Sequence, residues 1–208
     1  MADNDSHRPR SKRLGDYLVV SKGAINSAIE QQINAFTRGE EVGKLGETLL
    51  KSGIITQEDL DSSLRRQRME RLERCPVFSS MTKTDLYALS KHFTEFSVAP
   101  GETFIMQGED DPSLFVIASG RVEVYRIDNA GNETQIAEVG EAEPIGEMGY
   151  FTGEPRAACV RAIEPTQLLR AEYDDLTHYF ENVPRVALAF TKVVEERQRE
   201  LEAITSEK

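Results

Sequence analysis

The sequence predicts an α+β fold, in which a small helical domain precedes a β sandwich or barrel with flanking helices. A near-repeat with a period of 31 residues places apolar side chains at helical spacing in the first third of the chain. Seven short β-rich segments follow at regular intervals in the remainder. With 208 residues, the chain is long enough for two small domains that each bury a core. The predicted boundaries are a disordered head at 1–12, a helical repeat domain at 13–67 and a β domain at 68–208.

The head and the distribution of charge argue against a nucleic-acid partner. Residues 1–12 are polar and charged, which is typical of a disordered tail. Residues 1–67 hold ten basic and ten acidic side chains, and the rest hold 15 basic and 26 acidic, the whole net charge of −11. Because a duplex-binding module needs several cations on one face, and no helix-turn-helix pattern follows the β domain, we expect no DNA binding.

The repeat domain consists of two similar units, each with a short apolar helical turn, a glycine break and a second helix. The breaks are predicted at Gly23 and Gly53. Thr56 precedes acidic residues and a leucine stripe, which is typical of a capped helix start. The matched pairs are Leu14-Gly15 with Leu45-Gly46, Leu18-Val19 with Leu49-Leu50, Ile29 with Leu60, and Ile33 with Leu64.

The second domain is predicted to open with helices over 68–93, broken at Pro76, and to close with a long helix beginning near Pro184. The predicted strands are 95–98, 103–106, 114–118, 122–127, 135–139, 158–163 and 167–171, with a hairpin at 129–132. The final helix carries an apolar stripe of Val186, Leu188-Ala189, Val193-Val194, Leu201 and Ile204. Its charged end beyond Glu195 is interpreted as a lid or dimer helix, with a solvated end as the alternative.

Residues 146–160, with the sequence GEMGYFTGEPRAACV, are the candidate binding segment. The carboxylate of Glu147 can accept two hydrogen bonds from sugar hydroxyls, and the guanidinium of Arg156 can donate two to an anion. Gly149 permits close approach of backbone, and N–H groups at the start of a short helical turn favour an anion. The pattern therefore indicates a site for a hydroxyl and a phosphate. A glycine-rich surface loop with an ordinary ion pair is the alternative.

This segment resembles the phosphate-binding cassette of the cyclic nucleotide-binding domain family, in the Gly-Glu-Leu-Ala…Pro-Arg-Ala-Ala form of cAMP-dependent kinase regulatory subunits. The resemblance extends from about residue 71 to the C-terminus and implies a jelly-roll barrel with a lid helix. It implies that Glu147 holds the ribose 2′-hydroxyl and Arg156 the cyclic phosphate, with backbone amides assisting. Ala142 departs from the family, which usually has glycine in the turn before the cassette. The expected ligand-binding residues are Gly146, Glu147, Met148, Gly149, Arg156, Ala157 and Ala158.

The same resemblance favours cAMP over cGMP as the ligand. In relatives that prefer cGMP, a threonine often follows the arginine and its hydroxyl reaches the guanine amino group, whereas this chain has Ala157. No nucleophile stands beside a base, and no paired acids, metal-ligand spacing or P-loop appears, so we expect no enzyme and no metal. No apolar run is longer than about five residues, as at 114–118, so the sequence predicts no membrane span. Cys75 and Cys159 share no motif and indicate reduced thiols in a cytoplasm.

The second repeat unit, residues 44–67, resembles a unit of the N-terminal domain of type II secretion and pilus ATPases, the GspE/MshE family. Some members of that family bind cyclic di-GMP through two tandem units. In the first unit of this chain Gly23 stands one place late, and Phe36 replaces a terminal glutamine. We expect residues 13–67 to dock a protein partner and to be coupled to the β domain across 66–75. Cyclic di-GMP binding, an adaptor with a purely structural nucleotide domain and a homodimer through the final helix remain alternatives.

Overall fold

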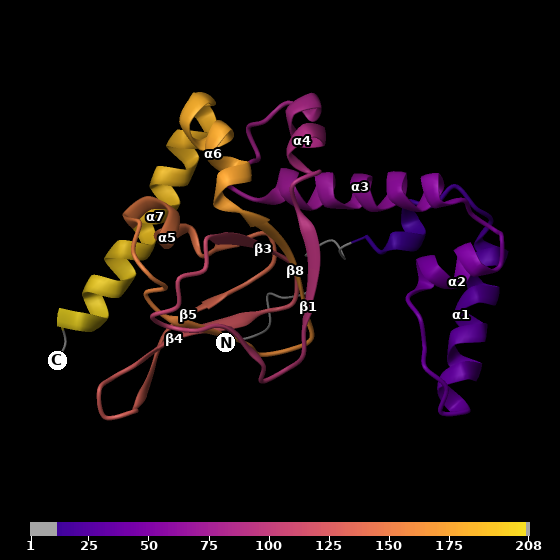
Figure 1. Ribbon diagram of the computed structural model, residues 1–208, viewed down its shortest axis with the longest axis horizontal. Helices are drawn as coiled ribbons and strands as arrows, with labels where there is room; N and C mark the ends of the chain where they lie inside the picture. Colours follow the sequence, from indigo (N-terminus) through magenta and orange to yellow (C-terminus); the bar gives the residue numbers. More distant parts are fainter. Residues whose placement is uncertain (1–11, 207–208) are drawn as a thin grey trace, which may run out of the picture. The chain divides into compact units, whose positions relative to one another are not determined.

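The computed structural model describes residues 12–206, so the predicted head at 1–12 lies almost entirely outside the described residues. The chain forms two compact units, Met1–Gln67 and Arg68–Lys208. The boundary falls inside one helix, α3 (Gln57–Arg74), which therefore supplies residues to both units (Figure 1). None of the helices in the described part combines the length and the apolar content that a membrane crossing requires.

The N-terminal unit is helical, and its first glycine break is not where the sequence indicates. Besides α3 it contains η1 (Leu14–Asp16), α1 (Lys22–Thr37) and α2 (Leu45–Lys51). Gly23 lies inside α1, because the Ser21 side chain accepts a hydrogen bond from the Ala24 amide at 3.2 Å and so starts the helix earlier. The prediction at Gly23 is therefore wrong. Gly53, with φ +67°, follows the end of α2.

The two repeat units do not pack alike in the core of this N-terminal unit. Leu60 is buried, whereas its counterpart Ile29 is 39% exposed. Leu64 packs against the core, whereas its counterpart Ile33 is 58% exposed. The buried residues of this core are Leu18, Ala28, Leu49, Ile55 and Leu60. The first unit therefore contributes Leu18 and Ala28 to this core but leaves Ile29 and Ile33 exposed.

The second unit contains two four-stranded antiparallel sheets, in the orders β1-β8-β3-β6 and β2-β7-β4-β5 (Figure 1). This pair of sheets agrees with the expected jelly roll. The strands are β1 (Thr94–Val98), β2 (Thr103–Ile105), β3 (Ser113–Ser119), β4 (Val122–Ile127), β5 (Glu133–Val139), β6 (Pro144–Ile145), β7 (Cys159–Ala162) and β8 (Thr166–Glu172). The sequence missed β6, because two residues beginning with proline carry no strand periodicity.

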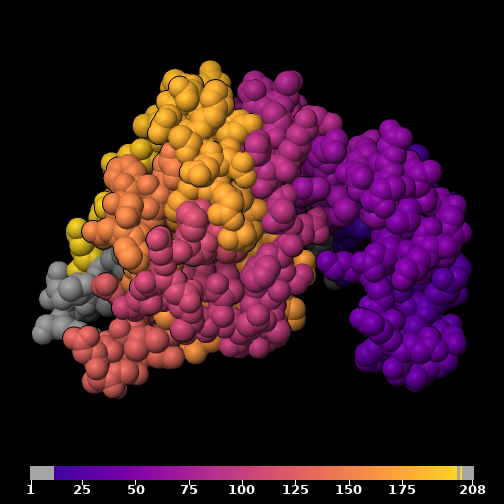
Figure 2. Space-filling view, in the orientation of Figure 1, coloured from indigo at the N-terminus to yellow at the C-terminus, as the bar shows by residue number. Residues whose placement is uncertain are grey.

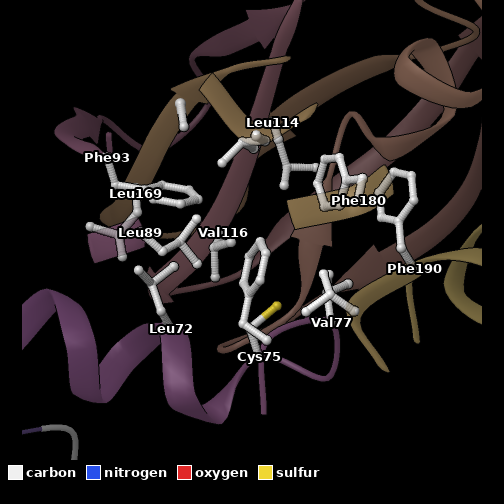
Figure 3. Close-up of a cluster of buried hydrophobic side chains, with 14 of the residues drawn as sticks. Leu72, Cys75, Val77, Leu89, Phe93, Leu114, Val116, Leu169, Phe180 and Phe190 are labelled. Carbon is white, nitrogen blue, oxygen red and sulfur yellow. The ribbon is translucent and has the colours of Figure 1, made fainter. Parts of the chain in front are cut away.

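Strand β3 is buried on both faces and joins the two cores of this unit. Phe115 and Ile117 point between the sheets, into a cluster with residues such as Val160. Leu114 and Val116, which alternate with them, point into a second cluster formed with the flanking helices (Figure 3). A central strand covered on both sides reads as a continuous apolar run, which is why the sequence predicts it clearly.

The flanking helices pack together, so that α5 lies against the C-terminal helices α6 and α7. These helices are α4 (Lys83–Leu89), α5 (Glu147–Thr152), α6 (Tyr173–Asn182) and α7 (Pro184–Ser206). Phe180 of α6 stacks on Phe190 of α7 with ring centroids 4.2 Å apart, and Tyr150 of α5 meets Phe180 edge-on at 4.8 Å. In the space-filling view the atoms of the α5 and α6 segments form one continuous surface (Figure 2). The side chains of Leu201 and Ile204, part of the predicted stripe, lie outside the described ones.

Candidate functional site

One pocket of the second unit lies between the barrel wall, α5 and α7. All seven residues expected at a ligand site line it, which places the whole candidate segment around one cavity. Ligand binding by these residues remains a prediction. The other lining residues are the apolar Ile105, Val124, Ile136, Ala137, Val139, Pro144, Ile145 and Val160, and the charged Arg197 and Glu200 of α7.

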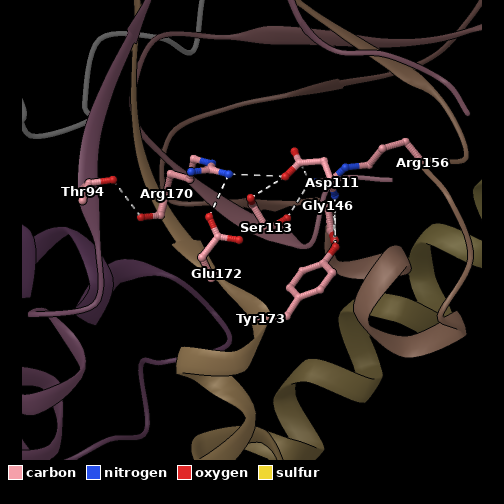
Figure 4. A network of polar contacts seen from close by, with 8 residues as sticks. All are labelled: Thr94, Asp111, Ser113, Gly146, Arg156, Arg170, Glu172 and Tyr173. Carbon is pink, nitrogen blue, oxygen red and sulfur yellow. Dashed lines mark hydrogen bonds and ion pairs between the residues drawn. The ribbon is translucent and has the colours of Figure 1, made fainter. Parts of the chain in front are cut away.

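Arg156 is the most firmly held side chain of the pocket, with 4% of its side chain exposed. Its Nη2 donates to Asp111 Oδ2 at 2.8 Å and to the Ser113 carbonyl oxygen at 2.7 Å. Its Nη1 donates to the Gly146 carbonyl oxygen at 3.2 Å and to the Tyr173 hydroxyl at 3.1 Å. The guanidinium is thus anchored through both terminal nitrogens (Figure 4). Such anchoring fixes the plane of the group before any ligand arrives.

The Nε of Arg156 is the one guanidinium nitrogen that the protein leaves without an acceptor. It is buried and has no hydrogen-bond partner among the described residues. A buried N–H without a partner costs about 1–3 kcal/mol, so its retention needs an explanation. Because Arg156 lines the pocket, an anionic oxygen held in the pocket would satisfy this donor. The residues present therefore fit a phosphate-bearing ligand.

Asp111 is the ionic partner that keeps Arg156 in place. Burial would raise the pKa of Asp111, but hydrogen bonds from Ser113 and Arg156, together with the charge of Arg170, lower it on balance. Arg170 lies 3.5 Å from Asp111 and 2.8 Å from Glu172, which extends the network along β8 (Figure 4). Asp111 therefore stays ionised and neutralises the arginine. This pairing could not be predicted from a local pattern, because Asp111 stands 45 residues before Arg156.

Gly146 makes the close packing around Arg156 possible. Its φ of +85° lies in the left-handed region, and a Cβ there would fall 2.3 Å from Arg156 Nη1 and 2.8 Å from the Ser113 carbonyl oxygen. Only glycine fits both the conformation and the space. Gly146 also caps α5, so the same residue starts the helix that carries Glu147.

Glu147 is buried in the pocket wall and does not pair with Arg156. Burial raises the pKa of Glu147, and this effect exceeds the opposing effects of its own backbone amide, Arg197 and Arg156. The nearest cationic atom is Arg197 Nε, 3.9 Å from Glu147 Oε1. Glu147 and Arg156 are therefore both buried, each beside other charged groups. The alternative of a surface loop with an ordinary ion pair is wrong.

Arg197 of α7 is a charged pocket residue that the candidate segment does not contain. It forms ion pairs of 3.0 Å with Glu143 and 3.0 Å with Glu200, besides the longer contact with Glu147. The charged end of α7 thus reaches the pocket instead of extending into solvent. The spacing of Arg197 and Glu200, one helical turn apart in a charged run, was the available signal.

Glutamine at position 147 is expected to make the ligand-free protein more resistant to urea at neutral pH. The folded state holds the Glu147 proton more tightly than the unfolded chain does, so the contribution of this carboxyl group to stability is greatest below its unfolded pKa. That contribution falls as pH rises through the raised folded pKa. Glu147→Gln removes this dependence. Urea unfolding of both proteins at pH 4 and pH 7 measures it.

The control for that measurement is Glu154→Gln, which removes an exposed carboxylate from the same segment of the chain. The advantage of Glu147→Gln over the native protein should shrink as the pH is lowered, and Glu154→Gln should show no such trend. Parallel pH curves for the native protein and Glu147→Gln would contradict an unfavourable buried charge at Glu147.

The chemistry of the pocket is that of a binding site with three different surfaces. Arg156 Nε offers a donor to an anion, Glu147 offers acceptors to hydroxyl groups, and the barrel offers an apolar wall. Within the described residues, no group of three or more histidine, cysteine, aspartate or glutamate side chains is arranged to hold a metal ion. These groups suit a ligand with an anionic group, hydroxyl groups and an apolar part.

Comparison with known proteins identifies this arrangement. Residues 95–183 match the family model of the cyclic nucleotide-binding domain. The chain carries a cyclic nucleotide-binding domain. The chain is 28% identical to the cAMP-dependent protein kinase regulatory subunit of Blastocladiella emersonii, with 74% of this chain and 45% of that protein covered. It is 27% identical to the cyclic AMP receptor protein of Thermus thermophilus, with 60% of this chain and 58% of that protein covered.

The fold of the cyclic nucleotide-binding domain is also found in a solved structure. The Thermus thermophilus catabolite activator protein matches with a TM-score of 0.56 and 26% identity, over 63% of this chain and 62% of that chain. This chain thus spans about half of each curated relative described here. The matched family segment contains Asp111, Glu147, Arg156 and Tyr173 but ends before Arg197.

Proposed function

We propose that the protein is a cytoplasmic receptor for cAMP and not an enzyme. The observation that carries the proposal is the buried Nε of Arg156, which has no acceptor although both terminal nitrogens are anchored. In this proposal the cyclic phosphate supplies the missing acceptor, and the ribose 2′-hydroxyl donates to Glu147. The names of the relatives, a cyclic AMP receptor and a cAMP-dependent kinase subunit, support cAMP as the nucleotide. We assign no catalytic residue.

The pocket is expected to bind cAMP more tightly than cGMP. Ala157 and Ala158 line the wall beside Arg156, and their methyl groups neither donate nor accept hydrogen bonds. A guanine amino group buried there would lose its hydrogen bonds to water, at a cost of about 1–3 kcal/mol, or about tenfold to a hundredfold in affinity. Isothermal titration calorimetry with each nucleotide measures the ratio. Equal or tighter binding of cGMP would contradict the assignment.

We also propose that residues 13–67 are an output module that docks a protein partner. Ile29, Ile33 and Phe36 of α1 are exposed and follow one another at spacings of four and three residues, which places them on one helix face. Phe36 is 77% exposed, and an aromatic side chain in such a position is typical of an interaction surface. The GspE/MshE-like assignment, cyclic di-GMP binding, a homodimer through α7 and an adaptor with a structural nucleotide domain remain predictions without independent support.

Hydrogen exchange, measured on the same samples as the calorimetry, tests whether this module is coupled to the nucleotide domain. Helix α3 has no glycine or proline between Gln57 and Arg74, so it can transmit a change along its axis. Hydrogen exchange over residues 13–67 should change when cAMP saturates the domain. Binding of cAMP without any change there contradicts the coupling, whereas absence of binding refutes the receptor itself and favours the adaptor alternative.

A further inference from the structure

Tyr173 lies at the junction between the pocket arginine and the C-terminal helices. It is the first residue of α6, and its hydroxyl accepts a hydrogen bond from Arg156 Nη1 at 3.1 Å. The same hydroxyl donates to the Gly146 carbonyl oxygen, which also accepts from Nη1 (Figure 4). The Tyr173 ring meets Tyr150 of α5 edge-on, with centroids 5.4 Å apart. The phenol therefore contacts the arginine, the start of α5 and the side of α5 at once.

The chain leaves space for this hydroxyl at Gly149. A Cβ at position 149 would lie 2.8 Å from Tyr173 Oη, which is closer than ordinary packing allows. Gly149 has no positive φ, so its backbone conformation does not require glycine. The absence of a side chain at position 149 is thus explained by the phenol, as well as by any approach of a ligand.

The contacts of the hydroxyl require a protonated phenol. A phenol that donates to the Gly146 carbonyl and accepts from Arg156 uses its proton and one lone pair together. Burial raises the pKa of Tyr173, which keeps the hydroxyl protonated throughout the neutral range.

The geometry points to Tyr173 as a positioning residue for Arg156, which holds Nη1 and thereby fixes the orientation of the guanidinium and of its unpartnered Nε. Asp111 and the Ser113 carbonyl hold only Nη2, and rotation about that anchor would move the Nε edge. Tyr173, together with the Gly146 carbonyl oxygen, supplies the second anchor at Nη1, and Tyr173 does so from α6, the helix that stacks on α7 through Phe180. This inference rests on the proposed function, because it specifies how the same site is prepared for a phosphate.

Tyr173→Phe tests the inference, because phenylalanine keeps the ring contact with Tyr150 and removes only the hydroxyl. The dissociation constant for cAMP should rise about tenfold, since one hydrogen bond to a charged donor is lost. Tyr179→Phe is the matched control on the same helix, and its aromatic contacts are with His92 and His178, away from the pocket. Its affinity should stay within about twofold of the native value.

A spectroscopic readout separates positioning from a general structural role. In the ligand-free protein, the Nε–H resonance of Arg156 should be sharp in ¹⁵N-edited NMR and should broaden in Tyr173→Phe but not in Tyr179→Phe. Gly149→Ala, which pushes the hydroxyl away while keeping the ring, should broaden it as well. If the resonance and the affinity are unchanged in Tyr173→Phe, the inference is overturned. If the native protein fails to bind cAMP, the proposed function fails, and the resonance still decides what Tyr173 does.

Discussion

Alanine at position 156 is expected to abolish cAMP binding, with an increase in the dissociation constant of at least about a hundredfold. Among the described residues that line the pocket, Arg156 is the one with a buried side-chain N–H that lacks an acceptor, and charge-assisted hydrogen bonds contribute about 1.5–3 kcal/mol each. Arg156→Lys should fail nearly as badly. The planar guanidinium can donate to Asp111, to the Ser113 carbonyl oxygen and to a phosphate at once, whereas a lysine ammonium is a single charged atom and cannot. Calorimetric titration with cAMP measures both variants.

The same variant should also lose stability, which the experiment must separate from lost binding. Removal of Arg156 leaves Asp111 partly buried without its main counter-charge, at a cost of about 1–3 kcal/mol. Urea unfolding gives the fraction of folded protein, and titrations are compared only between folded samples. Arg126→Ala, which removes an exposed arginine on β4 of the same barrel, is the control and should bind normally. Native affinity for cAMP in folded Arg156→Ala would show that the phosphate is placed elsewhere.

Gly146→Ala is expected to destabilise the protein by about 3 kcal/mol and to remove cAMP binding as well. A left-handed alanine costs about 1–2 kcal/mol, and overpacking against fixed groups adds about 1–3 kcal/mol. The added methyl group would fall on Arg156 Nη1 and the Ser113 carbonyl oxygen, so the guanidinium must move. Thermal unfolding and titration with cAMP measure the two effects on the same samples.

Gly131→Ala is the matched control for this substitution. Gly131 has φ +86°, almost the same conformation as Gly146, but a Cβ there would meet nothing within 4 Å. Gly131→Ala should therefore lose only the stability that the left-handed conformation costs an alanine, about 1 kcal/mol, and should keep its affinity for cAMP. The difference between the two variants isolates the contact with Arg156. Equal losses of stability in the two variants would show that Arg156 and the Ser113 carbonyl move aside for the added methyl group at little cost.

The sequence by itself determined those features whose physical cause is local. The buried run of β3 and the helix cap at Thr56 each follow from neighbouring residues. The candidate segment could be predicted for the same reason, since Glu147 and Arg156 stand in one short stretch with the glycines that shape it. All seven expected residues accordingly line a single pocket.

Only the tertiary structure decided which groups hold that pocket in its working geometry. Asp111, Tyr173 and Arg197 come from a loop, the start of α6 and the interior of α7, and no local pattern ties them to the segment they support. The same applies to β6, which is a strand only because it pairs with β3. Contacts across such sequence distances form when apolar cores pack the elements together, so the burial of Glu147 and the orphaned Nε of Arg156 are properties of the packed fold.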